Sequence, residues 1–327
     1  MTRLARVRRL LSPRMGAFLH GVAVRLHGRP WLKKRLLSVP KRIAERDLRS
    51  GLFLAFSWPL TRDLDVQLEV ATVGGRMLVD TADDIGRVLA VSGEWEPHIT
   101  EVFKRQLRPG DVCIDVGAHI GYYTLIASSL VGAQGHVHAI EPSPSRHRRL
   151  VENLRRNHIE NVTAWNIAAG QVGGSSVLYE APAANSGTSS LSPRVLDSSS
   201  ASADHYTEIE VPVARVDEIV PGEVFDRVRV VKVDVEGHEA EVLRGMESIL
   251  ACGTPMAVFV EIRPDLSLED SVEFVERLCS SHDFTLYLIA NEYGPSEYFP
   301  RRLVPPLRVD RVPAEPCDLL LLRGDEQ

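Results

Sequence analysis

Cysteine is scarce in this chain, and long apolar runs are missing. Four cysteines, Cys113, Cys252, Cys279 and Cys317, stand far apart among 327 residues. Without a CxC or CxxC pair, they offer neither a zinc-binding motif nor a disulfide framework. No uninterrupted apolar run reaches the roughly 18 residues that a membrane-spanning helix needs. No secretory signal fits the arginine-rich beginning of the sequence either. These absences favour a globular protein of the cytoplasm with reduced thiols.

Charge is distributed unevenly along the sequence. Residues 1–50 contain 14 lysines and arginines and two acids, which gives this segment a net charge of +12. The net charge of the whole chain is −6, so the other 277 residues carry −18. Leu4, Val7 and Leu11 recur at helical spacing between arginines, which predicts a basic, amphipathic helical extension over residues 1–50. Three partners remain open for it: the chain's own acidic body, the anionic inner face of a membrane, or nucleic acid. Nucleic acid is disfavoured because the extension has no interleaved aromatic residues.

The pattern changes twice after the basic extension. Residues 64–70 alternate between apolar and polar side chains and precede Gly74 and Gly75, which predicts a hairpin in a small β element over residues 51–90. Residues 91–327 repeat strand, loop and helix, which predicts a doubly wound α/β domain with a mostly parallel sheet. The expected strands are 112–116, 136–140, 162–166, 228–234, 256–261 and 285–289, with an edge strand at 319–322, and the expected helices are 95–107, 144–157, 238–251 and 269–281.

An insertion rich in Ala, Ser, Pro and Asn interrupts this domain at residues 181–204. Its composition indicates a long, mobile surface segment. Its position before a strand of the sheet is also compatible with a lid over an active site. A plain linker and a lid therefore both remain open.

The strongest local signal is the run from Asp115 to Gly121. A buried strand ends in an acid and leads into a glycine loop and a helix, and open α/β sheets bind ligands outside the carboxyl ends of their strands. Gly117 and Gly121 would let the backbone approach a ligand, although their GxxxG spacing differs from the GxGxxG of dinucleotide-binding loops. Asp115 would repel a phosphate and attract an ammonium group.

Glu141 ends the next apolar strand, 20 residues after Gly121. A carboxylate at this place can accept hydrogen bonds from two ribose hydroxyls. An acid, a glycine loop and a second acid together fit a nucleoside with an amino-acid tail and no phosphate, a description that S-adenosylmethionine meets. Ser143 and Pro144 predict the N-cap and first residue of the following helix.

A crowded polar turn follows the strand expected at 228–234. Asp234, Glu236 and His238 gather there, and Glu261 ends the next strand. Titratable groups at this density shift one another's pKa values, which favours a catalytic role for Asp234, Glu236 and His238. The alternative role is capping and stabilisation of the N-terminus of the following helix.

The chain resembles FkbM-type class I S-adenosylmethionine-dependent methyltransferases over residues 96–264. An ordered series of short motifs carries this resemblance, which makes it more specific than any single motif. The series comprises residues 96–97, 109–111, 115–121, 141–142, 150–153, 166, 169–170, 185, 187, 190–191, 216–217, 232–239, 243, 245 and 261.

The resemblance implies a Rossmann-like sheet of seven strands whose last strand is antiparallel. It implies S-adenosylmethionine as cofactor and methyl transfer to a hydroxyl of a sugar, glycolipid or natural product. His119 departs from the asparagine that is usual at its position, so the cofactor contact made there is not carried over. The implied cofactor-binding residues are Asp115, Gly117 and Gly121 for the amino-acid part, Glu141 for the ribose and Asn166 near the adenine.

A methyl acceptor with a neutral hydroxyl loses its proton during the attack, so a general base is expected. The first choice is His238, oriented by Asp234 or Glu236. A divalent metal held by these carboxylates would instead lower the pKa of the hydroxyl, although the residue spacing predicts no metal ligand set. The expected partner is a small-molecule or glycan acceptor.

Two other functions remain open from the sequence. A nicotinamide-dependent oxidoreductase shares the fold, but the GxxxG spacing and the preceding Asp115 argue against it. A non-catalytic protein that binds S-adenosylmethionine or a membrane is the other alternative, and the crowded turn at Asp234 argues against that.

Overall fold

The structure, a computed structural model, describes residues 66–197, 206–266, 271–291 and 303–324. The predicted basic extension over residues 1–50, the first part of the small β element and the end of the insertion lie outside these residues. The chain divides into two compact units. The first holds the described residues up to Thr72 and from Met77 to Pro97, and the second holds the remainder.

The predicted hairpin near residue 70 is present. Strands β1 (Gln67–Thr72) and β2 (Gly75–Asp80) form a two-stranded sheet, and the alternation of β1 buries Leu68 and Val70. Helix α6 (Asp84–Ser92), which the sequence analysis missed, follows at once. The side chain of Asp83 caps it by accepting a hydrogen bond from the backbone N–H of Gly86 at 3.1 Å.

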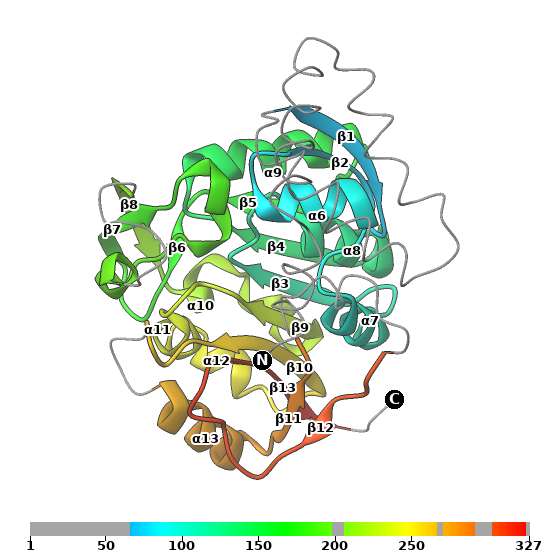
Figure 1. The fold of residues 1–327 in the computed structure, drawn as a ribbon. Helices are drawn as coiled ribbons and strands as arrows, with labels where there is room; N and C mark the ends of the chain where they lie inside the picture. The colour runs from blue at the N-terminus through cyan, green and yellow to red at the C-terminus, as the bar shows by residue number, and fades with distance from the viewer. Residues whose placement is uncertain (1–65, 198–205, 267–270, 292–302, 325–327) are drawn as a thin grey trace, which may run out of the picture. The chain divides into compact units, whose positions relative to one another are not determined.

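The second unit is built on an eight-stranded sheet in the order β12-β11-β13-β10-β9-β3-β4-β5 (Figure 1). Strands β5, β4, β3, β9 and β10 run parallel, and β13 runs antiparallel to both β10 and β11. The strands are β3 (Val112–Val116), β4 (His136–Ile140), β5 (Val162–Trp165), β9 (Val228–Val233), β10 (Met256–Ile262), β11 (Thr285–Ile289), β12 (Leu307–Arg308) and β13 (Cys317–Arg323).

The expected Rossmann-like sheet with its last long strand antiparallel is confirmed, and the two-residue β12 adds an eighth strand at one edge. The edge position predicted for residues 319–322 is wrong, because β13 lies between β10 and β11. Leu319, Leu320 and Leu321 are all buried there. A continuous apolar run suits a strand covered on both faces, whereas both residues of β12 are exposed.

Helices cover both faces of this sheet, as expected for a doubly wound fold. The chain moves outward from β3 through β4 to β5, and in the opposite direction from β9 to β10. Right-handed crossovers therefore place α8 and α9 on one face and α11 to α13 on the other (Figure 1). The helices are α7 (Pro97–Gln106), α8 (Tyr122–Val131), α9 (Pro144–Arg156), α10 (Val216–Ile219), α11 (Glu239–Arg244), α12 (Glu247–Leu250) and α13 (Ser271–His282).

The helix predicted over residues 238–251 is interrupted, and α11 and α12 replace it. The carboxylate of Asp217 accepts hydrogen bonds from the backbone N–H groups of Ser248 and Ile249, at 3.1 and 3.3 Å. These are among the N–H groups that the start of a helix leaves without partners. Asp217 therefore stabilises a new helix start, and its own N–H donates to the carbonyl of Gly245.

A second sheet of three strands lies outside the main one. It has the order β6-β8-β7 and comprises β6 (Ala168–Ala169), β7 (Gly174–Glu180) and β8 (Thr207–Ala214). The predicted insertion follows β7, and its first part forms two short 3₁₀ helices, Ala183–Thr188 and Pro193–Asp197. In the described part of the chain, each helix is too short or too polar to cross a bilayer.

Candidate functional site

The chain reverses its winding direction between β3 and β9, and the polar residues of interest gather at the carboxyl ends of these strands. The backbone N–H of Asp234 donates to the carbonyl of Val116 at 3.0 Å. A Cβ atom on Gly117 would lie 1.8 Å from the carbonyl oxygen of Asp234. The glycine loop and the turn after β9 are therefore packed together at the position where this class of sheet binds ligands.

The glycines of the loop are required by the packing of the protein itself. Gly117 and Gly121 have φ angles of 83° and 93°, which side-chain-bearing residues rarely adopt. A Cβ atom on Gly121 would lie 2.5 Å from Leu150. Their predicted contact with a cofactor stays a prediction, because this packing is sufficient to explain both glycines.

Asp115 lies on β3, and its side chain is hydrogen-bonded to the first turn of α8. Its side chain accepts a hydrogen bond from the hydroxyl of Thr124 at 2.6 Å, and the residue is 2% exposed. Burial raises the pKa of Asp115, and the charge of Lys232, its register partner on β9, opposes that rise. The carboxylate keeps acceptor sites beyond the one that Thr124 uses.

Glu141 is held by one backbone N–H at each carboxylate oxygen. His119 donates to Oε2 at 2.8 Å and Ser143 donates to Oε1 at 2.9 Å. A carboxylate has about four acceptor sites, so about two remain for the hydroxyls of a ribose. Burial raises the pKa of Glu141, and the nearby charge of Arg146 is the largest opposing influence.

Asn166 supports this arrangement from the end of β5. Its side-chain amide donates to the carbonyls of Glu141 and Pro142, at 2.9 and 3.0 Å. It therefore fixes the backbone that carries Glu141. The predicted place of Asn166 near an adenine is not tested by these contacts.

His119 joins the glycine loop to the insertion. Its Nε2 lies 2.7 Å from the hydroxyl of Ser186, and its backbone has a φ of 51°. Burial and the charges of Arg146 and Lys232 lower the pKa of His119 to about 3, so its imidazole is neutral at pH 7. The insertion is thus more than a linker, because its first 3₁₀ helix contacts the loop of the proposed cofactor site.

Arg146 was not singled out from the sequence. It lies in the first turn of α9 and is 8% exposed, beside Glu141 and His119, whose pKa values its charge lowers. No hydrogen bond or ion pair within the described residues engages its guanidinium. A buried cation with open donors, next to carboxylates that have spare acceptor sites, fits a nucleoside with an amino-acid tail. The donor set therefore suits S-adenosylmethionine.

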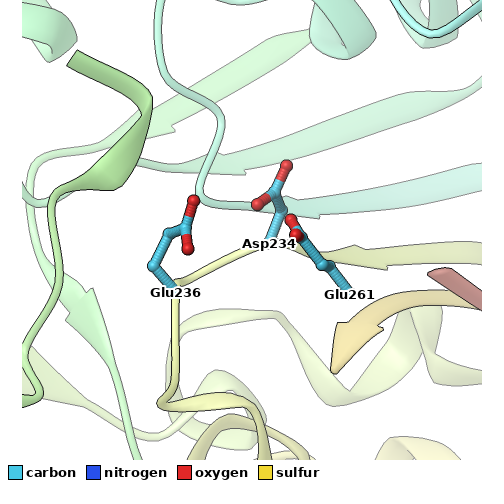
Figure 2. A group of neighbouring side chains, drawn as sticks. All are labelled: Asp234, Glu236 and Glu261. Carbon is cyan, nitrogen blue, oxygen red and sulfur yellow. The ribbon is translucent and has the colours of Figure 1, made fainter. Parts of the chain in front are cut away.

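Three carboxylates converge at the ends of β9 and β10. Asp234 and Glu236 come from the turn after β9 and Glu261 from β10 (Figure 2), and each offers an oxygen within 4.8 Å of the others. Two cations face them. The ammonium of Lys232 lies 2.6 Å from Asp234, and the guanidinium of Arg263 lies 2.6 Å from Glu236.

The surroundings of Asp234 and Glu236 shift the pKa values of these two acids in opposite directions. Burial disfavours the charge of Asp234, but Lys232 outweighs burial by its charge and hydrogen bond, so the pKa of Asp234 is lowered. Burial dominates at Glu236 and raises its pKa to about 7, despite the opposing charge of Arg263. Carboxylates whose pKa values are driven apart in this way are suited to different roles in proton transfer.

The trio has the oxygen donors that a hard divalent cation prefers. Lys232 and Arg263, however, already supply two positive charges to three carboxylates. They hold one oxygen each, Oδ2 of Asp234 and Oε2 of Glu236, so a metal ion at the remaining oxygens would lie beside two existing positive charges, which favours an organic ligand and proton transfer over a metal. Arg263 was missed in the sequence analysis, although its place two residues after Glu261 puts it at the same sheet edge.

His238 precedes α11, and Glu241 of that helix lies near its ring. Its Nδ1 is 3.6 Å from a carboxylate oxygen of Glu241, one helical turn further on. A Cβ atom on Gly170 would lie 3.6 Å from its Nε2. Glu241 is thus an acidic neighbour of the His238 ring, and both the expected orientation of His238 by Asp234 or Glu236 and its role as a base stay predictions.

The turn after β9 is itself tightly constrained. Glu236 has a φ of 54°, and the hydroxyl of Ser190 in the insertion donates to its carbonyl. The N–H of Gly237 donates to Oε1 of the fully buried Glu239 at 2.6 Å. Burial raises the pKa of Glu239 to about 8. Contacts on both sides thus fix the direction of the Glu236 side chain.

A small pocket opens beside the carboxylates. Glu261 and Asp318 are paired directly across β10 and β13, so their side chains share one face. Like charges in such a pair are destabilising, which indicates a role other than stability. The pocket is lined by Ile99, Lys232, Val233, Phe259, Val260, Glu261, Ile289, Asp318 and Leu319.

Comparison with known proteins gives a consistent result. A family model described as "Methyltransferase FkbM domain" matches residues 115–292. The chain is 28% identical over 219 residues to the hexuronic acid methyltransferase AglP of Haloferax volcanii, a match that covers 66% of this chain and 82% of that protein. It is 36% identical over 86 residues to the protein-L-isoaspartate O-methyltransferase of Ignicoccus hospitalis, covering 26% of this chain and 39% of that one.

Solved structures of methyltransferases are also similar. Methyltransferase FkbM from Methylobacillus flagellatus KT aligns with a TM-score of 0.41 and 15% identity, covering 72% of this chain and 52% of that chain.

Proposed function

The chain belongs to the FkbM methyltransferase family, and we propose from this premise that it methylates a hydroxyl oxygen of a sugar-containing acceptor. The methyl donor is S-adenosylmethionine. Family membership favours this reaction over the nicotinamide-dependent alternative. The observation that carries the proposal is the convergence of Asp234, Glu236 and Glu261 at the carboxyl ends of β9 and β10, beside a small pocket that Lys232 and Glu261 line.

The pocket supports a neutral, hydroxyl-rich acceptor. Glu261 and Asp318 offer carboxylate oxygens as hydrogen-bond acceptors for hydroxyls, and Phe259 and Ile99 supply an apolar wall. The same two carboxylates would repel an acceptor carboxylate. The relative AglP is named as a hexuronic acid methyltransferase, which supports a sugar acceptor.

S-adenosylmethionine supplies an activated methyl group and becomes S-adenosylhomocysteine when the acceptor oxygen takes that group. The acceptor hydroxyl must lose its proton in this step, and Glu236 is the proposed base. Its pKa of about 7 leaves a large ionised fraction at neutral pH. Arg263 holds Oε2 of Glu236, which leaves Oε1 to receive the proton. Asp234 stays ionised beside Lys232 and helps to orient the acceptor.

The test supplies the purified chain with deuterated S-adenosylmethionine and a panel of hexoses, hexuronic acids and glycolipids. Mass spectrometry then detects transfer of the labelled methyl group. A methyl ether survives mild alkali, whereas a methyl ester is hydrolysed. An alkali-stable label on a sugar is the expected outcome. An alkali-labile label would mean that a carboxylate is the acceptor and would contradict the proposal.

A further inference from the structure

Among the residues that the structure describes, Arg146 is a buried cation whose side chain has no hydrogen-bond or ion-pair partner. It occupies the first turn of α9, a helix whose start is capped by Ser143, and it is 8% exposed. Its guanidinium makes no hydrogen bond or ion pair inside the described ranges. A guanidinium carries five N–H donors, which are available to a ligand that lies beside the residue. Buried polar groups without a protein partner commonly meet a ligand or water.

The neighbours of Arg146 indicate which ligand that is. Its charge is the strongest influence that opposes the raised pKa of Glu141, and it also lowers the pKa of His119. The guanidinium is therefore close to Glu141, yet both Glu141 oxygens already accept backbone N–H groups. Ser143 links the two residues, because its N–H donates to Oε1 of Glu141 at 2.9 Å and its hydroxyl accepts the backbone N–H of Arg146 at 3.3 Å.

We propose that Arg146 is a cofactor-binding residue that donates a hydrogen bond to the adenosine half of S-adenosylmethionine. This inference rests on the proposed position of the ribose at Glu141. In an adenosine, O2′ of the ribose and N3 of the adenine lie side by side, and both can accept a hydrogen bond. The ammonium and sulfonium groups of the cofactor would be repelled by a guanidinium, so the adenosine half is the better partner for Arg146.

Calorimetric titration of S-adenosylhomocysteine into the full chain, without any acceptor, tests this inference. Arg146→Met should weaken binding by about 10- to 100-fold, as expected for the loss of a hydrogen bond from a charged donor. Arg148→Met removes the same charge from an exposed position on α9 and should leave affinity unchanged. If Arg146→Met does not fold, Arg146→Lys keeps the charge, loses the fork of donors and should still weaken binding.

Two analogues identify the contact. S-adenosylhomocysteine without adenine N3, or without O2′, removes one acceptor at a time. With the analogue that lacks the true acceptor, the Arg146 substitution should weaken binding little further, because the contact is already missing. The comparison is a double-mutant cycle, which measures the coupling between Arg146 and that acceptor atom. Wild-type affinity in the Arg146 variants, or a full additional loss with both analogues, would overturn the inference. Failure of the wild-type chain to bind S-adenosylhomocysteine would instead contradict the proposed function.

Discussion

At the ends of β3 and β4 the acids are held by hydrogen bonds, whereas at the ends of β9 and β10 they face cations. Glu141 accepts two backbone N–H groups and Asp115 accepts a threonine hydroxyl. Asp234 and Glu236 are paired with Lys232 and Arg263 instead. The acids of the first region are therefore held by neutral donors, whereas two acids of the second region are in direct ion pairs.

This difference separates binding from proton transfer. A carboxylate with fixed orientation and spare acceptor sites is suited to recognising hydroxyls. A carboxylate among other acids and cations has a pKa that the neighbours set, as at Glu236, whose pKa burial raises to about 7. Substitutions in the first region should therefore change cofactor affinity, and substitutions in the second should change rate and its dependence on pH.

The largest expected effect is that of Glu236→Gln. It should lower kcat/KM by about 10²- to 10⁴-fold, the range for loss of a general base, while the affinity for S-adenosylhomocysteine stays unchanged. Glu236 must be ionised to accept a proton, so wild-type kcat/KM should rise with pH up to about 7 and then level off. Initial rates across pH measure both effects.

His238→Gln is the matched comparison for that experiment. If Glu236 is the base, the histidine variant keeps the pH profile of the wild type. A larger loss in His238→Gln, with an intact profile in Glu236→Gln, would return the role of base to His238.

Glu239 should make folding stability depend on pH. Burial raises its pKa from 4.5 to about 8 in the folded state. Between these values the folded chain holds a proton that the unfolded chain has lost, so this group lowers stability as pH rises toward 8. Glu239→Gln should remove this loss and be more stable than the wild type at about pH 9 by roughly 1–4 kcal/mol.

Urea unfolding at about pH 5 and about pH 9 measures that gain. Glu247→Gln, at an exposed position on the next helix, controls for the added amide. Equal pH dependence in the wild type and Glu239→Gln would show that Glu239 is ionised in the folded chain.

Glu141→Ala tests the hydrogen-bonded region. It should weaken binding of S-adenosylhomocysteine by about 1–3 kcal/mol if two ribose hydrogen bonds are lost. Glu152→Ala, on the surface of α9, should bind with wild-type affinity. Calorimetry gives both values, and unchanged affinity in Glu141→Ala would remove Glu141 from the cofactor site.

The smallest expected effect is that of Asp318→Asn in the pocket. Loss of one charged acceptor should raise KM for the sugar acceptor by about 3- to 10-fold, equivalent to roughly 1 kcal/mol. Affinity for S-adenosylhomocysteine should not change, because the proposed function places Asp318 in the acceptor pocket. A shift in cofactor affinity with an unchanged KM would place Asp318 outside the acceptor pocket.

The strands of the main sheet were largely predictable from the sequence, and the other elements of the fold were less predictable. Strands β3, β4 and β11 have the predicted bounds, because apolar runs bounded by turn residues are a local signal. The polar, exposed strand β7 gave no such signal. Its partner β8 follows only after the insertion, and pairing at that distance is decided by tertiary packing.

The site divides in the same way. The acids at strand ends, such as Asp115, Glu141 and Asp234, could be found from the sequence because parallel strands have their carboxyl ends at the same edge of the sheet. Glu241 could have been found as the partner of His238 from its three-residue helical spacing. No local pattern pointed to Ser186 or Ser190, which reach the site from the insertion.

The sequence by itself determined most strands of the main sheet and the positions of the acids at their carboxyl ends, because these follow from hydrophobic periodicity along short segments. Only the tertiary structure decided which acid receives a cation and which is left with a raised pKa. Arg263 reaches Glu236 because β9 and β10 are neighbours in the sheet, whereas Lys232 reaches Asp234 from two residues away at the end of the same strand. Charge interactions and burial depend on distances across strands, which no local sequence pattern fixes.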